Sequence, residues 1–327
     1  MTRTKNAIVL GATGHVGQAV LRELISHGYR VAATTRQAGS SAFAGLDVEI
    51  RRGDADTPGQ LDAWIANHDV VVDAAAPSPS SVFVTDPGDP LAHARRRTQT
   101  LLDAVSRHKA QLAFISTFTT LPRPGGALSS AEAGWRRRIY PYFRVKQLME
   151  DMVLHAAAEG LPAVVVNPSA FLGPWEQGAN RSSFVRMVMA RELPAAMRHV
   201  INVIDVRDVA SLIRAALDAP SYGTRIPLAG HNVAVDELAR RISTIANVPA
   251  PPLATNTRAT EVAAYWVEAT LALTGRPAPD AWRAAPLIAD AWPMEHSAAQ
   301  RALRVRIRPL DDTLRDAVQW QRDLIQR

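Results

Sequence analysis

A tyrosine and a lysine with helical spacing are the residues of this sequence best suited to catalysis. Tyr142 and Lys146 stand four positions apart in "YPYFRVK", and Lys146 is one of only three lysines, beside Lys5 and Lys109, in a chain rich in arginine. Residues one helical turn apart share a face. We expect the ammonium of Lys146 to lower the pKa of the Tyr142 phenol from its ordinary ~10, which makes the phenol a usable acid or base.

Hydroxyl groups that can act with this pair follow an apolar strand. The run "LAFISTFTT" ends its apolar part at Ser116 and Thr117, upstream of Tyr142. A hydroxyl at that strand end can donate a hydrogen bond to the same substrate oxygen as Tyr142. Because the Tyr-x-x-x-Lys spacing also arises by chance, this second motif is what favours an enzyme.

A glycine-rich loop supplies the third motif. "AIVLGATGHVG" places three glycines between an apolar strand and a helix. The first allows a tight turn, the second lets a diphosphate approach the backbone, and the third permits close helix packing, with the anion at the helix N-terminus. The loop therefore predicts dinucleotide binding. The loop residues expected to contact the dinucleotide are Gly11, Thr13, Gly14, His15, Val16 and Gly17.

The end of the second strand indicates which dinucleotide is bound. Arg36 stands there, where a site for NAD usually carries a carboxylate for the ribose hydroxyls. A guanidinium can bind a 2′-phosphate through two hydrogen bonds, so NADPH is favoured over NAD, with a plain surface arginine as the alternative. Asp54 is a candidate for the adenine amine or for a turn, and the small residues Ala74, Ala75 and Ala76 leave room for the nicotinamide half.

Short apolar runs alternate with longer amphipathic stretches, which is typical of βαβ units. The predicted fold class is α/β, a Rossmann-type doubly wound parallel sheet with a smaller C-terminal substrate lobe. Ligands of such sheets bind beyond the carboxyl ends of the strands, which is where the motifs fall. Strands are predicted at 7–10, 30–35, 48–51, 69–74, 112–116 and 163–167, and helices at 16–27, 60–66, 90–108 and 143–159.

Two domains are expected from the length and from the placement of the motifs. Residues 1–170 form an NADP-binding Rossmann domain, which the segment 199–220 completes with a strand and a helix. Residues 171–327, mainly 171–198 and 221–327, form the substrate-binding lobe. Four aromatic residues are candidates for an apolar substrate pocket, with core packing as the alternative. They are Phe118, Phe171, Trp175 and Phe184.

The composition excludes several classes of protein. The absence of cysteine rules out disulfides and thiolate sites, and the nine histidines lack the spacing of metal ligands, so no metal is expected. No apolar run reaches the roughly 18–20 residues that a membrane-spanning helix needs. The N-terminus shows no cleavable signal, so we expect a cytoplasmic protein without a membrane partner.

The net charge of +6 comes from abundant arginine. Arginine triplets stand at 95–97 and 136–138 without interleaved aromatic residues, so no nucleic-acid partner is expected. We interpret both triplets as solvated helix faces. The alternative for 136–138 is that the triplet attracts an anionic small-molecule substrate.

Taken together, these motifs resemble those of the extended short-chain dehydrogenases/reductases, in the NAD-dependent epimerase/dehydratase superfamily. The resemblance continues almost to the C-terminus. The residues that carry it are "GATGHVG" at 11–17, "ST" at 116–117, "YFRVK" with Glu150 after it, "VNPSAFLGP" at 166–174 and "DVRDVA" at 205–210.

This resemblance implies roles for the polar residues. Tyr142 would be the general acid/base, Lys146 its pKa tuner and ribose ligand, and Thr117, with Ser116 as the fallback, the donor to the substrate oxygen. The segment 205–208 is expected to hold the fold together through a helix cap and salt bridges. A homodimer through the two long helices is a further expectation. The residues implied at the nicotinamide end are Asn167, Pro168 and Ser169.

Departures from the sugar-nucleotide members of the superfamily favour a reductase. "STFTTLPRPGGALSS" lacks their Tyr-Gly pair, Arg36 replaces their acidic residue, and the segment before "DVRDVA" is too short for their Gly-Asp-Gly hairpin. The chain looks closer to dihydroflavonol and cinnamoyl-CoA reductases, which implies NADPH-dependent reduction of an aldehyde or ketone. The alternatives are an epimerase or dehydratase of a sugar or related small molecule, and a dinucleotide sensor without turnover.

Overall fold

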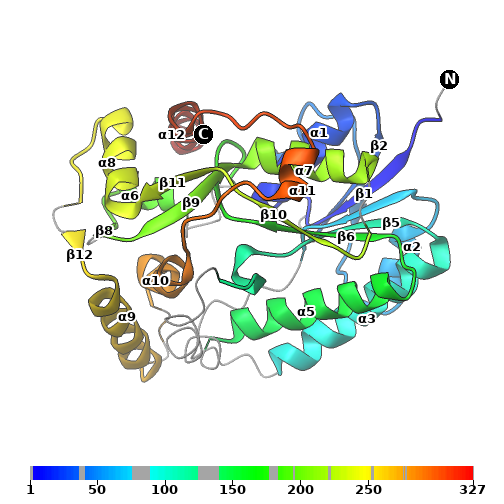
Figure 1. Ribbon diagram of the computed structural model, residues 1–327, viewed down its shortest axis with the longest axis horizontal. Helices are drawn as coiled ribbons and strands as arrows, with labels where there is room; N and C mark the ends of the chain where they lie inside the picture. The colour runs from blue at the N-terminus through cyan, green and yellow to red at the C-terminus, as the bar shows by residue number, and fades with distance from the viewer. Residues whose placement is uncertain are drawn as a thin grey trace.

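A parallel sheet of seven strands forms the centre of the protein. The computed structural model describes residues 3–36, 41–75, 89–123, 140–176, 183–193, 196–219, 222–251, 254–274, 276 and 278–326. The strand order β10–β6–β5–β4–β1–β2–β3 confirms the predicted Rossmann-type doubly wound sheet (Figure 1). The strands are β1 (Asn6–Leu10), β2 (Arg30–Thr35), β3 (Glu49–Arg52), β4 (Val70–Asp73), β5 (Gln111–Ile115), β6 (Ala163–Pro168) and β10 (Arg225–Leu228).

Helices cover both faces of this sheet (Figure 1). One layer holds α1 (His15–Ser26) and α7 (Val206–Asp218), which pack against each other. The other layer holds α2 (Gln60–Ile65), α3 (Pro90–His108) and α5 (Pro141–Ala158). The six predicted strands all lie within one residue of the observed ends, because the apolar runs that define them are local features of the chain.

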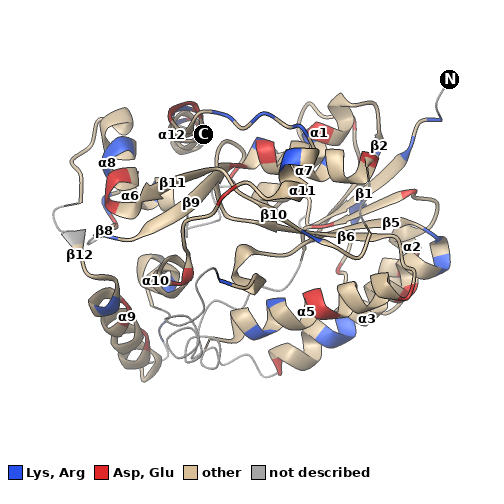
Figure 2. Ribbon diagram, viewed as in Figure 1, with Lys and Arg blue, Asp and Glu red and all other residues tan. Residues whose placement is uncertain are grey.

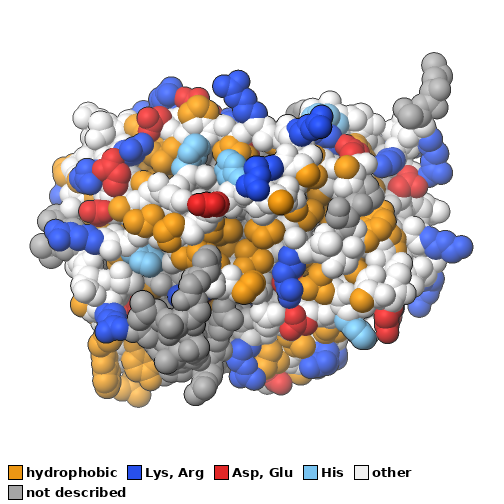
Figure 3. Space-filling view, viewed as in Figure 1, with side chains coloured by type: hydrophobic (Ala, Val, Ile, Leu, Met, Phe, Trp, Pro, Cys, Tyr) orange, Lys and Arg blue, Asp and Glu red, His pale blue; other side chains and the backbone are white. Residues whose placement is uncertain are grey.

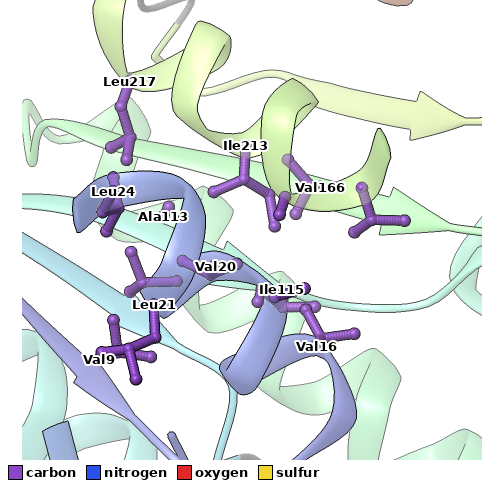
Figure 4. Packing of buried hydrophobic residues seen from close by; sticks show 14 of the residues in the cluster. Val9, Val16, Val20, Leu21, Leu24, Ala113, Ile115, Val166, Ile213 and Leu217 are labelled. Carbon is purple, nitrogen blue, oxygen red and sulfur yellow. The ribbon is translucent and has the colours of Figure 1, made fainter. Parts of the chain in front are cut away.

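Alternate residues of each strand face the two helical layers. In β1, Ala7 and Val9 belong to the core beneath α1 and α7, whereas Ile8 and Leu10 belong to the core beneath α2, α3 and α5. This alternation follows from the side-chain period of two in a strand, and burial on both faces explains why the strands are continuously apolar. Figure 4 shows side chains of α1 and α7 directed at the sheet in the first of these cores.

A second lobe continues from one end of the sheet. Its three-stranded sheet has the order β11–β9–β7, and its apolar core is separate from the two cores of the main sheet. The remaining strands are β7 (Ala170–Leu172), β8 (Ala196–Met197), β9 (Val200–Asp205), β11 (His231–Ala234) and β12 (Ala254–Thr255). The helices are η1 (Ser41–Phe43), η2 (Phe118–Thr120), α6 (Phe184–Met189), α8 (Val235–Ala246), α9 (Thr257–Ala272), α10 (Asp280–Asp290), α11 (Ala298–Ala302) and α12 (Leu310–Ile325).

The segment 199–220 was expected to complete the Rossmann domain with both a strand and a helix, but only its helix packs there. Its helix α7 packs on α1, but its strand β9 pairs with β7 and β11, and the seventh strand of the main sheet is β10. Side-chain hydrogen bonds hold β9 in this position. Asn202 lies in the middle of β9, donates to Asn232 of β11 at 2.7 Å and accepts from the backbone of Gly230 at 2.7 Å.

Charged residues of both signs are scattered over the face seen in Figures 2 and 3. Arg95 and Arg96 are exposed as expected, but Arg97 is only 5% exposed, so the solvated-face interpretation is wrong for the third arginine of that triplet. Each helical residue is rotated by about 100° from the last, which turns Arg97 toward the sheet. The triplet at 136–138 lies outside the described residues. No helix of the described part of the chain is long and apolar enough to span a membrane.

Asp205 joins the second lobe to the main sheet, as the sequence predicts for its segment. Its carboxylate caps α7 by accepting from the backbone of Arg207 at 2.8 Å, and it also accepts from the side chain of Arg207 at 2.9 and 2.7 Å. Thr313 of α12 donates to the same carboxylate at 2.8 Å. Because its side chain is completely buried, these donors are its only compensation for lost water.

Replacement of Asp205 should therefore destabilise the fold. We expect Asp205→Ala to lower the free energy of unfolding by about 3 kcal/mol, since it removes a cap and leaves buried donors unsatisfied. The matched control is Asp316→Ala, which removes a 48% exposed partner of the same Arg207 and should change stability by less than about 1 kcal/mol. Urea denaturation measures both, and equal losses in the two variants would contradict this assignment.

Candidate active site

Two adjoining pockets lie at the carboxyl ends of the central strands. The first, of about 400 Å³, extends from the glycine loop over the ends of β2, β3 and β4. The second, of about 450 Å³, extends from the same loop over the end of β5 toward α5 and the second lobe. Both are lined by Gly14 and Ala74, so they meet at the glycine loop. Together they form the elongated groove that an extended dinucleotide requires.

The glycine loop has the geometry of a diphosphate cradle. A Cβ atom on Gly11, whose φ is +73°, would stand 2.7 Å from the carbonyl oxygen of Ala74, and one on Gly17 would overlap the carbonyl oxygen of Gly11. These positions therefore require glycine. No side chain caps the N-terminus of α1 at Gly14, which leaves the backbone N–H groups of the first turn available to an anion. The loop thus fits a dinucleotide.

Arg36 and Asp54, which were predicted to contact the adenosine half of the dinucleotide, line the first pocket together with Thr13 and Ala75. Arg36 is exposed at its rim, just after β2. Asp54 also lines it and accepts a hydrogen bond from the backbone of Asp56 at 3.0 Å, which is the alternative turn role. Ala76 lies outside the described residues.

The predicted catalytic residues line the second pocket together. Tyr142 and Lys146 come from the first two turns of α5, and Ser116 and Thr117 follow β5. Pro141 occupies the first turn of α5, where its missing N–H is not needed, so the helix begins immediately before Tyr142. The pocket lining also includes other predicted residues. They are His15, Val16, Gly17, Pro168 and Ser169.

The charge state of Tyr142 differs from the prediction. Burial raises the pKa of its phenol above the ordinary value, and hydrogen bonding with the hydroxyl groups of Thr117 and Thr119 only partly opposes this. The nearby Asp290 acts in the same direction as burial. The expectation that Lys146 lowers this pKa is therefore wrong, because desolvation by burial dominates. Tyr142 is a neutral phenol at neutral pH.

Lys146 is a buried lysine without a fixed partner. It is 7% exposed, and among the described residues its ammonium makes neither a hydrogen bond nor an ion pair. Burial lowers its pKa to about 8, with Asp73 acting upward, Arg97 downward and Glu150 upward. The ammonium is thus charged at neutral pH and its three donors face the pocket uncommitted.

A buried carboxylate one turn beyond Lys146 organises the pocket floor. Glu150 accepts from the Ser116 and Thr120 hydroxyls, the latter at 2.6 Å, and from Asn167 Nδ2 at 2.7 Å. It also forms an ion pair with Arg225. Because the hydroxyl of Ser116 is directed at Glu150, the hydroxyls that remain toward Tyr142 are those of Thr117 and Thr119.

Two predicted cofactor residues are fixed by other contacts. Asn167 is fully buried and donates to the carbonyl of Thr117 at 3.2 Å, so it lies beneath the pocket rather than in its lining. His15 contacts the carbonyl of Pro174 at 2.9 Å and the ring of Phe171 edge-on. Burial lowers the pKa of His15 to about 4, so its imidazole is neutral at neutral pH.

The second lobe supplies the apolar wall of the second pocket. Ile201, Leu287, Ile288 and Ala291 line it opposite the polar residues, and none of these was predicted. Of the predicted aromatic residues, Phe118 and Phe171 line this pocket. The other two lie elsewhere: Trp175 stacks under Arg22, 4.8 Å from ring centroid to guanidinium carbon, and Phe184 lines a separate cavity.

Sequence analysis also missed the ion pair of Asp73 and Arg97 and the role of Glu150. A charged residue in the apolar strand β4 was the available signal for Asp73. The spacing of four residues between Lys146 and Glu150 was the available signal for the role of Glu150. Neither signal identifies a partner, because both carboxylates bind groups distant in sequence.

Comparison with known proteins supports this description of the fold. The profile of a family described as "NAD dependent epimerase/dehydratase family" matches residues 7–227. Over 322 residues the chain is 25% identical to a Synechocystis sp. protein with the provisional name dihydroflavonol 4-reductase, covering 95% of this chain and 93% of that one. It is 26% identical over 269 residues to sterol demethylase protein B of Methylococcus capsulatus, covering 76% of each chain.

A solved structure shows the same fold. It is the crystal structure of a nucleoside-diphosphate-sugar epimerase from Pseudomonas aeruginosa, with a TM-score of 0.71 and 21% identity. The similarity covers 98% of each chain, so it includes the second lobe as well as the main sheet.

Burial of an unpaired lysine should reduce stability. The folded-state pKa of Lys146, about 8, lies below the unfolded value of 10.5, so the folded state binds the proton less tightly. We expect Lys146→Met to raise the free energy of unfolding at pH 7 by roughly 3 kcal/mol. The advantage should shrink as the pH rises from about 8 toward 10.5, because the unfolded chain then binds protons that the folded chain has released.

The control for this prediction is Lys109→Met, which replaces an exposed lysine. It should change stability by less than about 0.5 kcal/mol at any of these pH values. Urea denaturation at several pH values measures both variants. A Lys146→Met protein that is less stable than the native one at pH 7 would show that the lysine is compensated after all.

Proposed function

This chain belongs to the NAD-dependent epimerase/dehydratase family, and we propose that it is an NADPH-dependent reductase of an aldehyde or ketone. As an enzyme of the extended short-chain dehydrogenase/reductase type, it uses NAD(P). The observation that carries the proposal is that Tyr142, Lys146 and Thr117 line one pocket, directly beside the glycine loop. The name of the Synechocystis relative, which specifies a reductase, gives additional support.

The raised pKa of Tyr142 suits the direction of reduction. A neutral phenol can give its proton to the oxygen of a carbonyl group as negative charge develops there. Thr117 donates a hydrogen bond to the same oxygen, and the Lys146 ammonium stabilises the phenolate that remains on Tyr142. When bound, NADPH supplies the hydride that adds to the carbonyl carbon, and the product is an alcohol.

The cofactor is held by residues of the first pocket and of the glycine loop. The N–H groups at the start of α1 bind its diphosphate, and Lys146 binds the hydroxyls of the ribose next to the nicotinamide. Arg36 binds the 2′-phosphate, which is the basis for proposing NADPH rather than NADH. Asp54 and Ala75, which line the first pocket, would contact the adenosine half.

The substrate is a small organic carbonyl compound with a largely apolar body. The wall formed by Phe118, Leu287 and Ile288 faces the reactive residues and offers few hydrogen-bonding groups. The names of the two curated relatives mention a dihydroflavonol and a sterol, and both are ring systems with extensive apolar surface. A sugar nucleotide would leave its many hydroxyl groups without partners against such a wall.

We extend the proposal to the organisation of the protein. Residues 1–170 with 199–220 bind the cofactor, and 171–198 with 221–327 select the substrate. A homodimer would form through α3 and α5, which lie side by side (Figure 1). A hollow of about 520 Å³ between these helices, lined in part by Leu102, Met152 and Leu161, supports that location.

A panel of aldehydes and ketones tests the reaction. We expect the purified protein to oxidise NADPH in the presence of apolar members of the panel, seen as loss of nicotinamide absorbance. Tyr142→Phe should lower kcat/KM by about 10²- to 10⁴-fold, because the proton donor is lost. The control is Tyr222→Phe, which changes an exposed tyrosine and should have native activity.

Other outcomes of this panel identify the alternatives. Tightly bound NAD with no net consumption of cofactor would indicate an epimerase or dehydratase. Cofactor binding with no turnover, and identical behaviour of the native protein and Tyr142→Phe, would indicate a sensor. Either result would overturn the reductase proposal.

Arg36 should determine the choice between the two dinucleotides. We expect Arg36→Ala to raise the Kd for NADPH by about 10- to 100-fold, since it removes charge-assisted hydrogen bonds to the phosphate. The Kd for NADH should stay within about twofold, because NADH lacks that phosphate. Fluorescence titration measures both constants, with Arg30→Ala at the opposite end of β2 as the control. Equal weakening of the two dinucleotides would exclude this role.

A further inference from the structure

A buried ion pair lies next to the proposed catalytic lysine. Asp73 ends β4 and is fully buried, and the side chain of Arg97, on α3, is 3% exposed. The guanidinium donates two hydrogen bonds to the two carboxylate oxygens, at 2.9 and 2.7 Å, and the backbone N–H of Ala75 donates a third at 3.1 Å. Arg97 therefore occupies both oxygens of Asp73.

Lys146 lies within electrostatic reach of this pair. Its pKa responds to Asp73, to Arg97 and to Glu150 of its own helix. Of these, Glu150 is already bound by Ser116, Thr120, Asn167 and Arg225. Both carboxylates that could form an ion pair with Lys146 are thus occupied by other donors, and within the described part of the chain Lys146 makes no such pair.

This arrangement is unusual for a buried lysine. A carboxylate without a partner in a low-dielectric environment attracts a nearby ammonium strongly. Besides Arg97, Lys146 is the cation that acts on the pKa of Asp73. If Arg97 did not bind Asp73, the ammonium of Lys146 would be an available replacement, and its donors would turn from the pocket toward the end of β4. The positive charge of Arg97 also lowers the pKa of Lys146. Loss of Arg97 would therefore raise that pKa for this reason as well.

We propose that Arg97 is a positioning residue: by occupying Asp73 it keeps the ammonium of Lys146 uncommitted and directed at the groove, where it can bind sugar hydroxyls beside Tyr142. The structural part of this statement is independent of turnover. Its catalytic consequence rests on the proposed reductase function.

The small number of lysines makes a direct test practicable. Protein labelled with ¹³C at lysine Cε gives resonances from Lys5, Lys109 and Lys146 alone, and the Lys146→Met variant assigns the third. Titration of that resonance should give a pKa near 8 in the native protein. In Arg97→Met the unpaired carboxylate of Asp73 should raise this pKa by about one unit or more.

The matched control is Arg96→Met, which changes an exposed arginine on the same helix and should leave the titration of Lys146 unchanged. Circular dichroism verifies that each variant is folded. A folded Arg97→Met protein with the native pKa at Lys146 would overturn the proposal. Because this readout needs neither cofactor nor substrate, it remains decisive even if no carbonyl compound is reduced.

A second variant separates positioning from a merely structural role. Asp73→Asn with Arg97→Gln keeps a hydrogen-bonded pair of similar size but removes the carboxylate that could capture Lys146. We expect kcat for carbonyl reduction to fall at least about tenfold in Arg97→Met and to recover to within about threefold of native in the double variant. A folded double variant whose kcat stays at least about tenfold below the native value would overturn the proposal, and this comparison with native protein stands even if Arg97→Met alone fails to fold.

Discussion

Burial of charge along one face of α5 is the constraint on which the site depends. A buried charge is strongly destabilising unless other groups compensate it. Glu150 is compensated by hydroxyl, amide and guanidinium donors, and Asp73 by Arg97. Lys146 is the exception among the described residues, and its lowered pKa is the physical sign of that exception. The availability of this lysine is therefore a consequence of how its neighbours are paired.

The same contacts connect the scaffold to the chemistry. The donors to Glu150 come from the end of β5, from β6 and from β10, which are neighbours in the sheet. One carboxylate thus fixes α5 against three strands, while Asn167 of β6 also holds the backbone of Thr117. The second lobe contributes differently, since α10 adds the apolar side chains of Leu287 and Ile288 to the lining of the pocket.

Much of the fold and many of the site residues could be predicted from local sequence. The six predicted strands were correct to within one residue, and Gly11 and Gly17 stand where a Cβ atom would collide with backbone. Periodicity and the sterics of glycine are local properties, so they are visible in the sequence. The wrong predictions concern how deeply a side chain is buried in the folded protein. Arg97 was assigned to a solvated face, and the pKa of Tyr142 was expected to fall, whereas burial raises it.

The sequence by itself determined the parallel sheet, the cradle at the start of α1 and the shared helical face of Tyr142 and Lys146, because each depends on residues close together in the chain. Only the tertiary structure decided which charges are paired and which remain available. Asp73 and Arg97 are 24 residues apart, and Glu150 and Arg225 are 75 apart. Proton affinity and hydrogen-bond partners are set by such distant neighbours and by burial, neither of which has a signature at the residue itself.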